Sequence, residues 1–432
     1  MKYWMIVVLS LLLALPARAG VEVREVTSPG GVSAWLVEEP SIPFVALEIR
    51  FRGGASLDAP GKRGATNLMM GLLEEGAGSL DSQGFARAAE ALAAQFDYDV
   101  SDDTASVSAR FLSENKDQAI ALLRLSLVAP TIDETALERV RGQVLAGIRS
   151  DAQDPNAIAG RAFDALAFGD HPYGSPLEGS AETVQALSRD DIVAAYRGLL
   201  ARDRVHVAAV GDITEAELGT LLDHLLGDLP AAGAPMPAPV QPMLSGGTTL
   251  IDYDTPQAVA LFGHQGMARD DEDFFAAYVL NTILGGGGFE SRLMEEVRVK
   301  RGLTYGVYSY LVPKDLAALY LGSVSSANDR IFEAVEVIRA EWARMAAHGV
   351  TEEELTRAKA LLTGAYPLRF DGNGAIARIL VGMQIEGLGT DYIATRNARV
   401  NAVTRADVNR VAAELLRPEG LHFVIVGKPG KG

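Results

Sequence analysis

Histidine and cysteine are the side chains that most often bind transition metals or act as nucleophiles, and in this sequence the six histidines are dispersed and cysteine is absent. The absence of cysteine removes disulfides, thiol catalysis and thiolate metal sites together. No two histidines share the spacing that places a pair of ligands on one face of a helix. We therefore expect the histidines to be structural or surface residues: His171, His206, His224, His264, His348 and His422.

Two other patterns could suggest ligand binding, and each has a simpler interpretation. Residues 285–288 are consecutive glycines, but the Gly-Lys-Ser/Thr sequence of a phosphate-binding loop does not follow them. They favour a hinge, or a loop that closely approaches an extended peptide. The acidic residues between Asp97 and Asp103 lack the glycine and the distal glutamate of a calcium loop, so we expect a solvated turn between strands.

The elements that would position such residues are arranged as two similar halves. Residues 207–212 and 423–428 each form an apolar strand closed by glycine, and Ser188 and Thr404 each precede a helix as predicted N-caps. Residues 131–134 and 350–353 each open a long helix. These pairs share an offset of about 216 residues, which indicates an internal repeat.

Within each half, strand patterns come first and helix patterns follow. Residues 44–51 and 105–111 alternate as strands do, whereas residues 83–92 and 114–128 have helical periodicity. We therefore predict an α+β protein with two homologous domains, each with an antiparallel-rich sheet and helices packed on one face. The predicted domains are residues 20–229 and 248–432, joined by a proline-rich, semi-rigid linker at 230–247.

The N-terminus predicts a cleaved secretory signal peptide, residues 1–19. Lys2 precedes an apolar run at residues 6–15, and Ala17-Arg18-Ala19 is an A-x-A cleavage pattern. We accordingly expect export to a bacterial periplasm, with no membrane association after cleavage. The net charge of −17 argues against nucleic acid or an anionic membrane as a partner.

The first half contains His171-Pro172-Tyr173-Gly174, followed by Gly179 and residues 210–212. This order is similar to the first-domain pattern of one family, the pitrilysin-type (inverzincin, M16) zinc peptidases. Residues 284–293 resemble its second-domain glycine-rich loop, and residues 61–76 resemble its metal-binding helix. The similarity covers essentially the whole mature chain, and it implies half of a clam shell that closes around a peptide.

The resemblance breaks at the metal site. The family's helix carries H-x-x-E-H, in which two histidines bind zinc and the glutamate is the base. This sequence has Asn67, Met70 and Gly71 at those places, and Gly147 where the family has a third ligand, a glutamate about 75 residues further on. A catalytic zinc needs about three protein ligands and an open position for water. We therefore expect no metal in this chain.

The resemblance also implies a substrate-anchoring pair in the second half, Arg298 and Tyr305. The family supplies an arginine and a tyrosine at this spacing to hold and polarise the substrate peptide. Arg298 is predicted to end a helix that begins near Ser291, Gly302 to permit a turn, and Tyr305 to start a strand. Guanidinium and phenol donors can bind a peptide carbonyl and stabilise an oxyanion. Gly285, Gly286, Gly287 and Gly288 are the predicted substrate-binding loop.

Together these features predict a zinc-less subunit of a heterodimeric periplasmic M16 peptidase that is inactive alone. Its expected partner is a homologue with an intact H-x-x-E-H, which would hold the zinc, while Arg298 and Tyr305 anchor the peptide and stabilise the oxyanion. One alternative is a stand-alone, non-proteolytic peptide-binding or scaffolding protein of the same fold. Another is a single-chain metallopeptidase with unorthodox ligands, which metal analysis of the purified chain would test.

Overall fold

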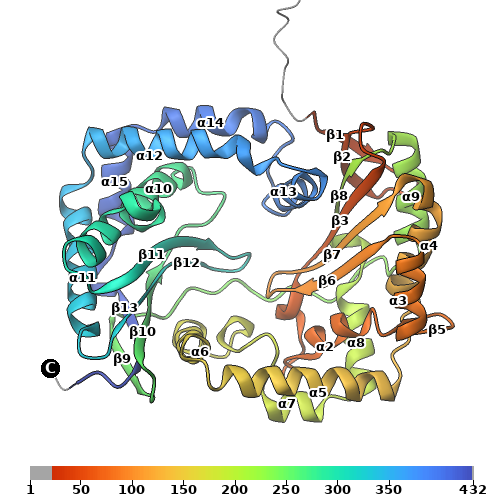
Figure 1. Cartoon of the computed structure of the whole chain (residues 1–432), viewed down its shortest axis with the longest axis horizontal. Helices are drawn as coiled ribbons and strands as arrows, with labels where there is room; N and C mark the ends of the chain where they lie inside the picture. The colour runs from red at the N-terminus through yellow and green to blue at the C-terminus, as the bar shows by residue number, and fades with distance from the viewer. Residues whose placement is uncertain (1–21, 431–432) are drawn as a thin grey trace, which may run out of the picture.

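The computed structural model describes residues 22–430, and its first half is built on a mixed sheet (Figure 1). Within the described residues the strand order is β1–β2–β8–β3–β7–β6, with β2 and β8 parallel and the other neighbours antiparallel. The predicted strands at 44–51 and 105–111 are confirmed as β3 and β7. The bounds are β1 (Arg24–Thr27), β2 (Ser33–Glu38), β3 (Phe44–Arg52), β6 (Gln95–Val100), β7 (Thr104–Leu112) and β8 (Val205–Gly211). The predicted signal peptide, residues 1–19, lies outside the described residues.

Helices of the first half cover one face of this sheet. Alternate residues of β3, from Val45 to Phe51, are fully buried on that face because a strand turns every second side chain to the same side. A short hairpin of β4 (Gly76–Ala77) and β5 (Leu80–Asp81) follows the first of these helices. The helices are α2 (Ala65–Leu72), α3 (Ser82–Ala91), α4 (Lys116–Val128), α5 (Glu134–Asp151), α7 (Ala181–Ala186), α8 (Arg189–Leu199) and α9 (Glu215–Leu226).

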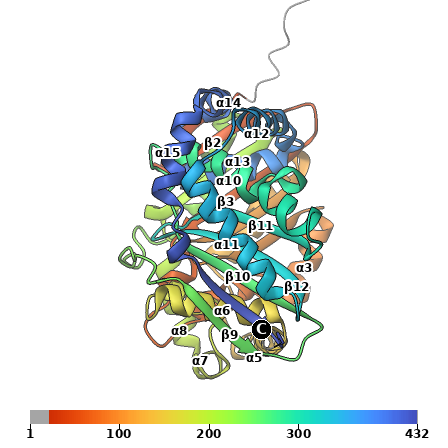
Figure 2. The ribbon, with the colours of Figure 1, turned by 90° about the vertical axis from the view of Figure 1, so that its left-hand side faces the viewer.

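The second half repeats this plan. Its sheet has the order β11–β12–β10–β13–β9, again with one parallel pair, β13 and β9. Figure 2 shows α11 lying across β10 and β12. The core is aromatic there, because Phe262 stacks on Phe423 and Trp342 meets Phe262 edge-on. The elements are β9 (Gly247–Asp252), β10 (Gln257–Gln265), β11 (Thr304–Pro313), β12 (Ala318–Ala327), β13 (His422–Gly427), α10 (Phe274–Asn281), α11 (Ile331–His348), α12 (Glu352–Ala365), α14 (Tyr392–Ala402) and α15 (Arg405–Leu415).

The helix starts follow the sequence signals. Ser188 and Thr404 both form capping boxes, at the N-termini of α8 and α15. Asp133 caps α5 and Thr351 caps α12, at the repeated positions where long helices were predicted to open.

Two helices pack on the sheet of the opposite half, which the sequence did not predict. α6 (Pro155–Phe168) packs on β10 and β13, where Phe163 is buried against Val424 and its neighbours. α13 (Asn373–Ile385) returns to the first half and packs on β3 and β8, where Leu380 meets Ala46 and its neighbours (Figure 1). The prediction that helices pack on one face of each sheet is therefore wrong, because each sheet also has a helix from the other half across its second face.

The proline-rich segment is held against the protein body. Val240 donates its backbone N–H to Leu316 O (2.8 Å), and Met243 donates to Ala167 O (2.8 Å). Its last residue already belongs to β9, which begins at Gly247. Within residues 22–430, no helix combines the length and the apolarity needed to cross a membrane.

Candidate functional site

The start of α2 is fixed by a partly buried carboxylate. Asp58 accepts hydrogen bonds from the backbone N–H of Gly64 (2.8 Å) and Thr66 (2.8 Å) and from the Thr66 hydroxyl (2.7 Å). These bonds satisfy N–H groups that a helix leaves free at its N-terminus. Burial raises the pKa of Asp58. Gly64 has a φ of 99°, a left-handed conformation that glycine adopts without strain.

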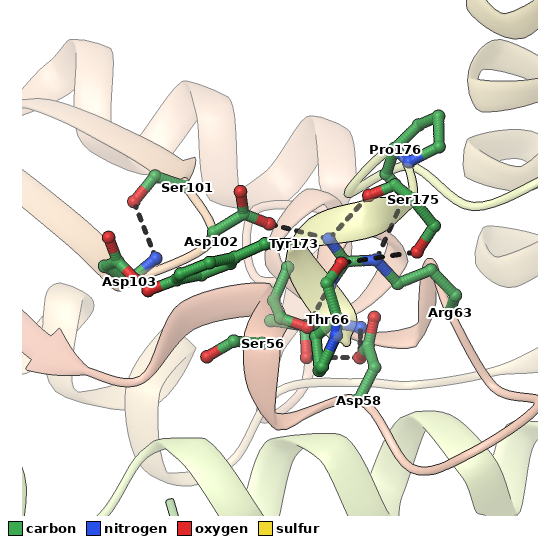
Figure 3. A network of polar contacts seen from close by, with 12 residues as sticks. Ser56, Asp58, Arg63, Thr66, Ser101, Asp102, Asp103, Tyr173, Ser175 and Pro176 are labelled. Atoms are coloured by element: carbon green, nitrogen blue, oxygen red, sulfur yellow. Dashed lines mark hydrogen bonds and ion pairs between the residues drawn. The ribbon is translucent and has the colours of Figure 1, made fainter. Parts of the chain in front are cut away.

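Arg63, immediately before α2, ties this helix to its surroundings (Figure 3). Its guanidinium donates to Ser175 O (3.0 Å), Pro176 O (3.1 Å) and Ala55 O, and pairs with Asp102 (2.6 Å). The residue is only 9% exposed. A buried guanidinium with this many acceptors fixes the position and the direction of α2.

Asp102 and Asp103 connect this network to the second half. Asp102 also pairs with Lys314 (2.8 Å), which lies between β11 and β12. Tyr173 donates its hydroxyl to Asp103 and accepts the N–H of Leu316 (3.2 Å). The predicted turn between strands is confirmed at residues 101–103, between β6 and β7, but the prediction that it is solvated is wrong because Asp102 and Asp103 are partly buried. Residues 97–100 belong to β6, and the turn that follows is a junction between the two halves because it meets charged groups from both.

The predicted degenerate metal positions lie on two helices that pack against each other, α2 and α5. Asn67 is half-buried, and Met70 is 2% exposed within the core of the first half. Gly71 faces α5, since a Cβ there would lie 3.0 Å from Val140 Cγ1, whereas a Cβ on Gly147 would meet nothing within 4 Å. One amide, one thioether and two glycines do not fit a zinc ion. Within residues 22–430, no three histidine, cysteine or carboxylate side chains gather as a metal site.

His264 shows the structural role expected of a dispersed histidine. It is 2% exposed and receives the indole N–H of Trp342 at Nε2 (3.0 Å), while Nδ1 lies 2.6 Å from Gln265 O. The ring is therefore neutral, with its proton on Nδ1. Burial lowers the pKa of His264 to about 4.

The glycine-rich loop packs closely on β11. Residues 282–286 form a π-helical turn, in which a Cβ on Gly285 would lie 2.7 Å from Ser309 N. Gly285 is buried, Gly286 is exposed, and Gly287 and Gly288 are half-buried. The first of the four predicted substrate-binding glycines thus allows close packing of the loop, and the other three reach the surface.

Arg298 lies on a second π-helical segment, Met294–Val299, where the sequence predicted an ordinary helix end. The wider turn is a feature often found near functional sites. The guanidinium of Arg298 stacks over the ring of Phe289 from the glycine-rich loop, with Cζ 4.5 Å from the ring centre. This cation–π contact links the predicted anchoring arginine to the predicted substrate-binding loop.

Glu296 fixes the chain that follows Arg298. Glu296 is 8% exposed, and its carboxylate pairs with Lys300 (2.7 Å) and Arg301 (2.7 Å). These ion pairs lower the pKa of Glu296. Gly302 then turns the chain with a φ of 60°, as the sequence predicted. Sequence reasoning did not identify this role of Glu296, although its spacing to Lys300 is that of a helical ion pair.

Tyr305 opens onto solvent at the start of β11, an edge strand of the described sheet. Its exposed fraction is 85%, and it lies where the register between β11 and β12 shifts, between Thr304 and Val307. Such irregularities in a ladder can redirect a side chain next to a functional site. Tyr308 and Tyr310 continue the exposed aromatic groups along β11.

The order of these elements matches known protein families. The family described as "Insulinase (Peptidase family M16)" matches residues 34–181, and "Peptidase M16 inactive domain" matches residues 186–362. An uncharacterized zinc protease of Streptomyces coelicolor is 30% identical over 407 residues, which cover 91% of this chain and 87% of the relative. The chain therefore belongs to the M16 peptidase family.

One further relative is named a non-peptidase homolog, and one solved structure is named for the inactive domain of the family. The non-peptidase homolog YmxG of Helicobacter pylori is 27% identical over 91% of each chain. A solved structure described as the peptidase M16 inactive domain from Pseudomonas fluorescens superimposes with a TM-score of 0.89 at 27% identity, covering 95% of this chain and 98% of that chain. These comparisons establish the two-domain α+β fold of the family.

Proposed function

We propose that this protein is the zinc-less subunit of a heterodimeric periplasmic M16 peptidase. One contrast carries the proposal. The residues at all the ligand positions on α2 and α5 are unable to bind zinc, whereas Arg298 lies over Phe289 of the glycine-rich loop and Tyr305 is exposed to solvent. A chain with only this part of the site can contribute to peptide hydrolysis when another chain supplies the rest.

The proposal divides the work between two chains. A homologue with an intact H-x-x-E-H would hold the zinc and the base. This chain would bind the scissile carbonyl through Arg298 and Tyr305, placing positive and hydrogen-bonding groups where the oxyanion develops. β11 is an edge strand of the described sheet, and an extended peptide would pair with it as an added strand.

Co-expression of this chain with such a homologue, followed by a peptide-cleavage assay, tests the proposal. We expect activity only from the mixture, and we expect Arg298→Ala to lower kcat about 10²–10³-fold, the usual cost of one oxyanion donor. Arg405→Ala is the matched control, since Arg405 is a half-exposed arginine on α15 that pairs with Glu352 (3.7 Å). Tyr305→Phe removes only the phenolic donor and should lower kcat without weakening the association of the two chains.

The other outcomes separate the alternatives. If mixing produces no activity and the chain still binds peptides, it is a stand-alone binding or scaffolding protein. Stoichiometric zinc and robust hydrolysis by the purified chain alone would contradict both interpretations. Equal turnover by Arg298→Ala and wild type would remove the role assigned to Arg298.

A further inference from the structure

A pocket of about 400 Å³ lies where α13 meets the helices of the second half. Its walls come from α10, α13, α14 and the turn Tyr366–Arg369. This volume is within the range of small-molecule sites. The pocket is separate from both the α2–α5 pair and the Arg298–Tyr305 segment. Its charged and aromatic lining residues are Arg269, Arg369, Arg378, Arg396, Glu386, Phe274, Phe275, Tyr278, Tyr366 and Tyr392.

The lining carries an excess of positive charge. Four arginines face one carboxylate, that of Glu386, although the whole chain has a net charge of −17. Arg269 is the partner of Glu386 (2.8 Å) and also donates to the Tyr392 hydroxyl (2.9 Å). Arg378 lies 3.8 Å from Glu48, and Arg369 is exposed. The pocket therefore attracts anions on an otherwise acidic protein.

Arg396 is the group that most requires an anion. It is 4% exposed, and its guanidinium donates to neutral acceptors, Leu362 O (2.7 Å), Asn397 Oδ1 (3.0 Å) and the Tyr278 hydroxyl (3.4 Å). Within residues 22–430 no carboxylate lies within 4.0 Å of it. Arginine remains charged when buried, and a buried charge without an opposite charge is costly.

The aromatic rings give the pocket flat apolar walls. Arg396 lies over the Tyr366 ring at 4.4 Å, and Arg269 lies over the Phe274 ring at 4.3 Å. Both stacked guanidiniums already donate to protein acceptors, so Arg369 and Arg378, which make no hydrogen bond within the described residues, are the arginines left to pair with a carboxylate or phosphate. A ligand that fits these walls has a planar apolar body as well as an acidic group.

We propose that this pocket binds a small organic anion, with a carboxylate or phosphate held by the arginines and a planar body held against the aromatic rings. The bound anion would join α13, which packs on the sheet of the first half, to α10 and α14 of the second half. This site is independent of the proposed peptidase role.

Calorimetric titration and thermal unfolding with four probes test the proposal: phenyl phosphate, benzoate, inorganic phosphate and neutral benzyl alcohol. We expect phenyl phosphate or benzoate to bind with a Kd below about 1 mM and to raise Tm. Their relative affinities identify the acidic group. Inorganic phosphate should bind more weakly because it lacks the planar body, and benzyl alcohol should not bind. Added salt should weaken binding.

Variants then locate the site. Arg369→Gln combined with Arg378→Gln should weaken binding at least about tenfold, because each charged hydrogen bond contributes on this scale. Both side chains are at the surface, so the fold should persist, which circular dichroism checks. Arg357→Gln is the control and should bind as wild type does. Absence of binding by both aromatic anions, or equal affinity in the double variant and wild type, would overturn the proposal.

Discussion

The α2–α5 pair and the Arg298–Tyr305 segment differ in two properties: the contacts that hold each in place, and the reactive side chains that each carries. Around α2, the buried Arg63 and the partly buried Asp58 fix the helix through several hydrogen bonds, yet Asn67, Met70 and Gly71 cannot bind zinc. In the second half, Tyr305 is exposed and Arg298 is held by one ring. Positioning contacts can therefore persist where reactive groups are absent, so a well-ordered site is no evidence of activity.

The largest expected effect comes from restoring the zinc ligands on α2 and α5, which would remove the difference between the two regions. Combining Asn67→His, Met70→Glu, Gly71→His and Gly147→Glu should give about one zinc per chain, because α2 and α5 already pack together. Gly147 has open space, while a residue at 71 requires Val140 to move slightly. Mass spectrometry of the dialysed protein measures the metal.

The matched control keeps the first, second and fourth substitutions and places alanine at position 71. It should bind far less zinc, because one ligand is missing. Equal metal content in the two variants would show that α2 and α5 no longer have the ligand geometry of the family.

Removing the Arg63 contacts that hold α2 in place should have the next largest effect. Arg63→Ala deletes the buried guanidinium that joins α2 to Asp102 and to several carbonyls, so we expect a loss of about 3–5 kcal/mol in the free energy of unfolding. Urea unfolding measures this. Arg87→Ala, at an exposed position on α3, should change stability by less than about 0.5 kcal/mol. A similar small change for Arg63 would show that α2 does not depend on this network.

The junction between the halves provides a pH test. Burial, reinforced by Asp102, raises the pKa of Asp164 from its ordinary 3.8 to about 6, although Lys314 opposes the change. The folded state therefore retains a proton that the unfolded chain releases. The stability that comes from this tighter binding of a proton to Asp164 is complete below about pH 4 and is lost as the pH rises through about 6.

Asp164→Asn should consequently be more stable than wild type at pH 7.5, by about 1–3 kcal/mol. The advantage should shrink steadily as the pH falls towards 4. Urea unfolding across this range measures it, with exposed Asp252→Asn as the control. An advantage that does not vary with pH would contradict the assignment.

The smallest expected effect tests whether Gly147 is an ordinary helix position. Gly147→Ala should stabilise the protein by about 0.5–1 kcal/mol, because the position is exposed, is inside α5 and has room for a Cβ. Gly285→Ala should destabilise it, since its Cβ would overlap Ser309. Thermal unfolding compares the two, and a destabilised Gly147→Ala would show that this glycine has a packing role.

The sequence predicted the repeated plan because its signals are local. Ser188 and Thr404 are followed three residues later by aspartates that complete their capping boxes, and β3 and β7 alternate clearly. The positions of Arg298, Gly302 and Tyr305 before and at the start of β11 also followed from local sequence.

What the sequence could not predict depends on distant contacts. Arg63 and Lys314 meet through Asp102 only after both halves have folded, and a charged residue gives no local sign that it will be buried. The crossing of α6 and α13 was missed for the same reason, since their apolar faces do not specify which sheet they will cover. The arginines of the pocket come from separate elements and carry no shared motif.

Because each sheet is covered by a helix from the other half, the packing of the first sheet is completed only after α13 has been synthesised. Ala46 and Val210 belong to the first half, but the helix that covers them, α13, is among the last elements to be synthesised. An N-terminal fragment that ends at the proline-rich segment would expose an apolar strip on its sheet, which favours aggregation. We therefore expect neither half to fold alone, and fragments that divide the molecule at its linker should be insoluble unless both pieces are produced together.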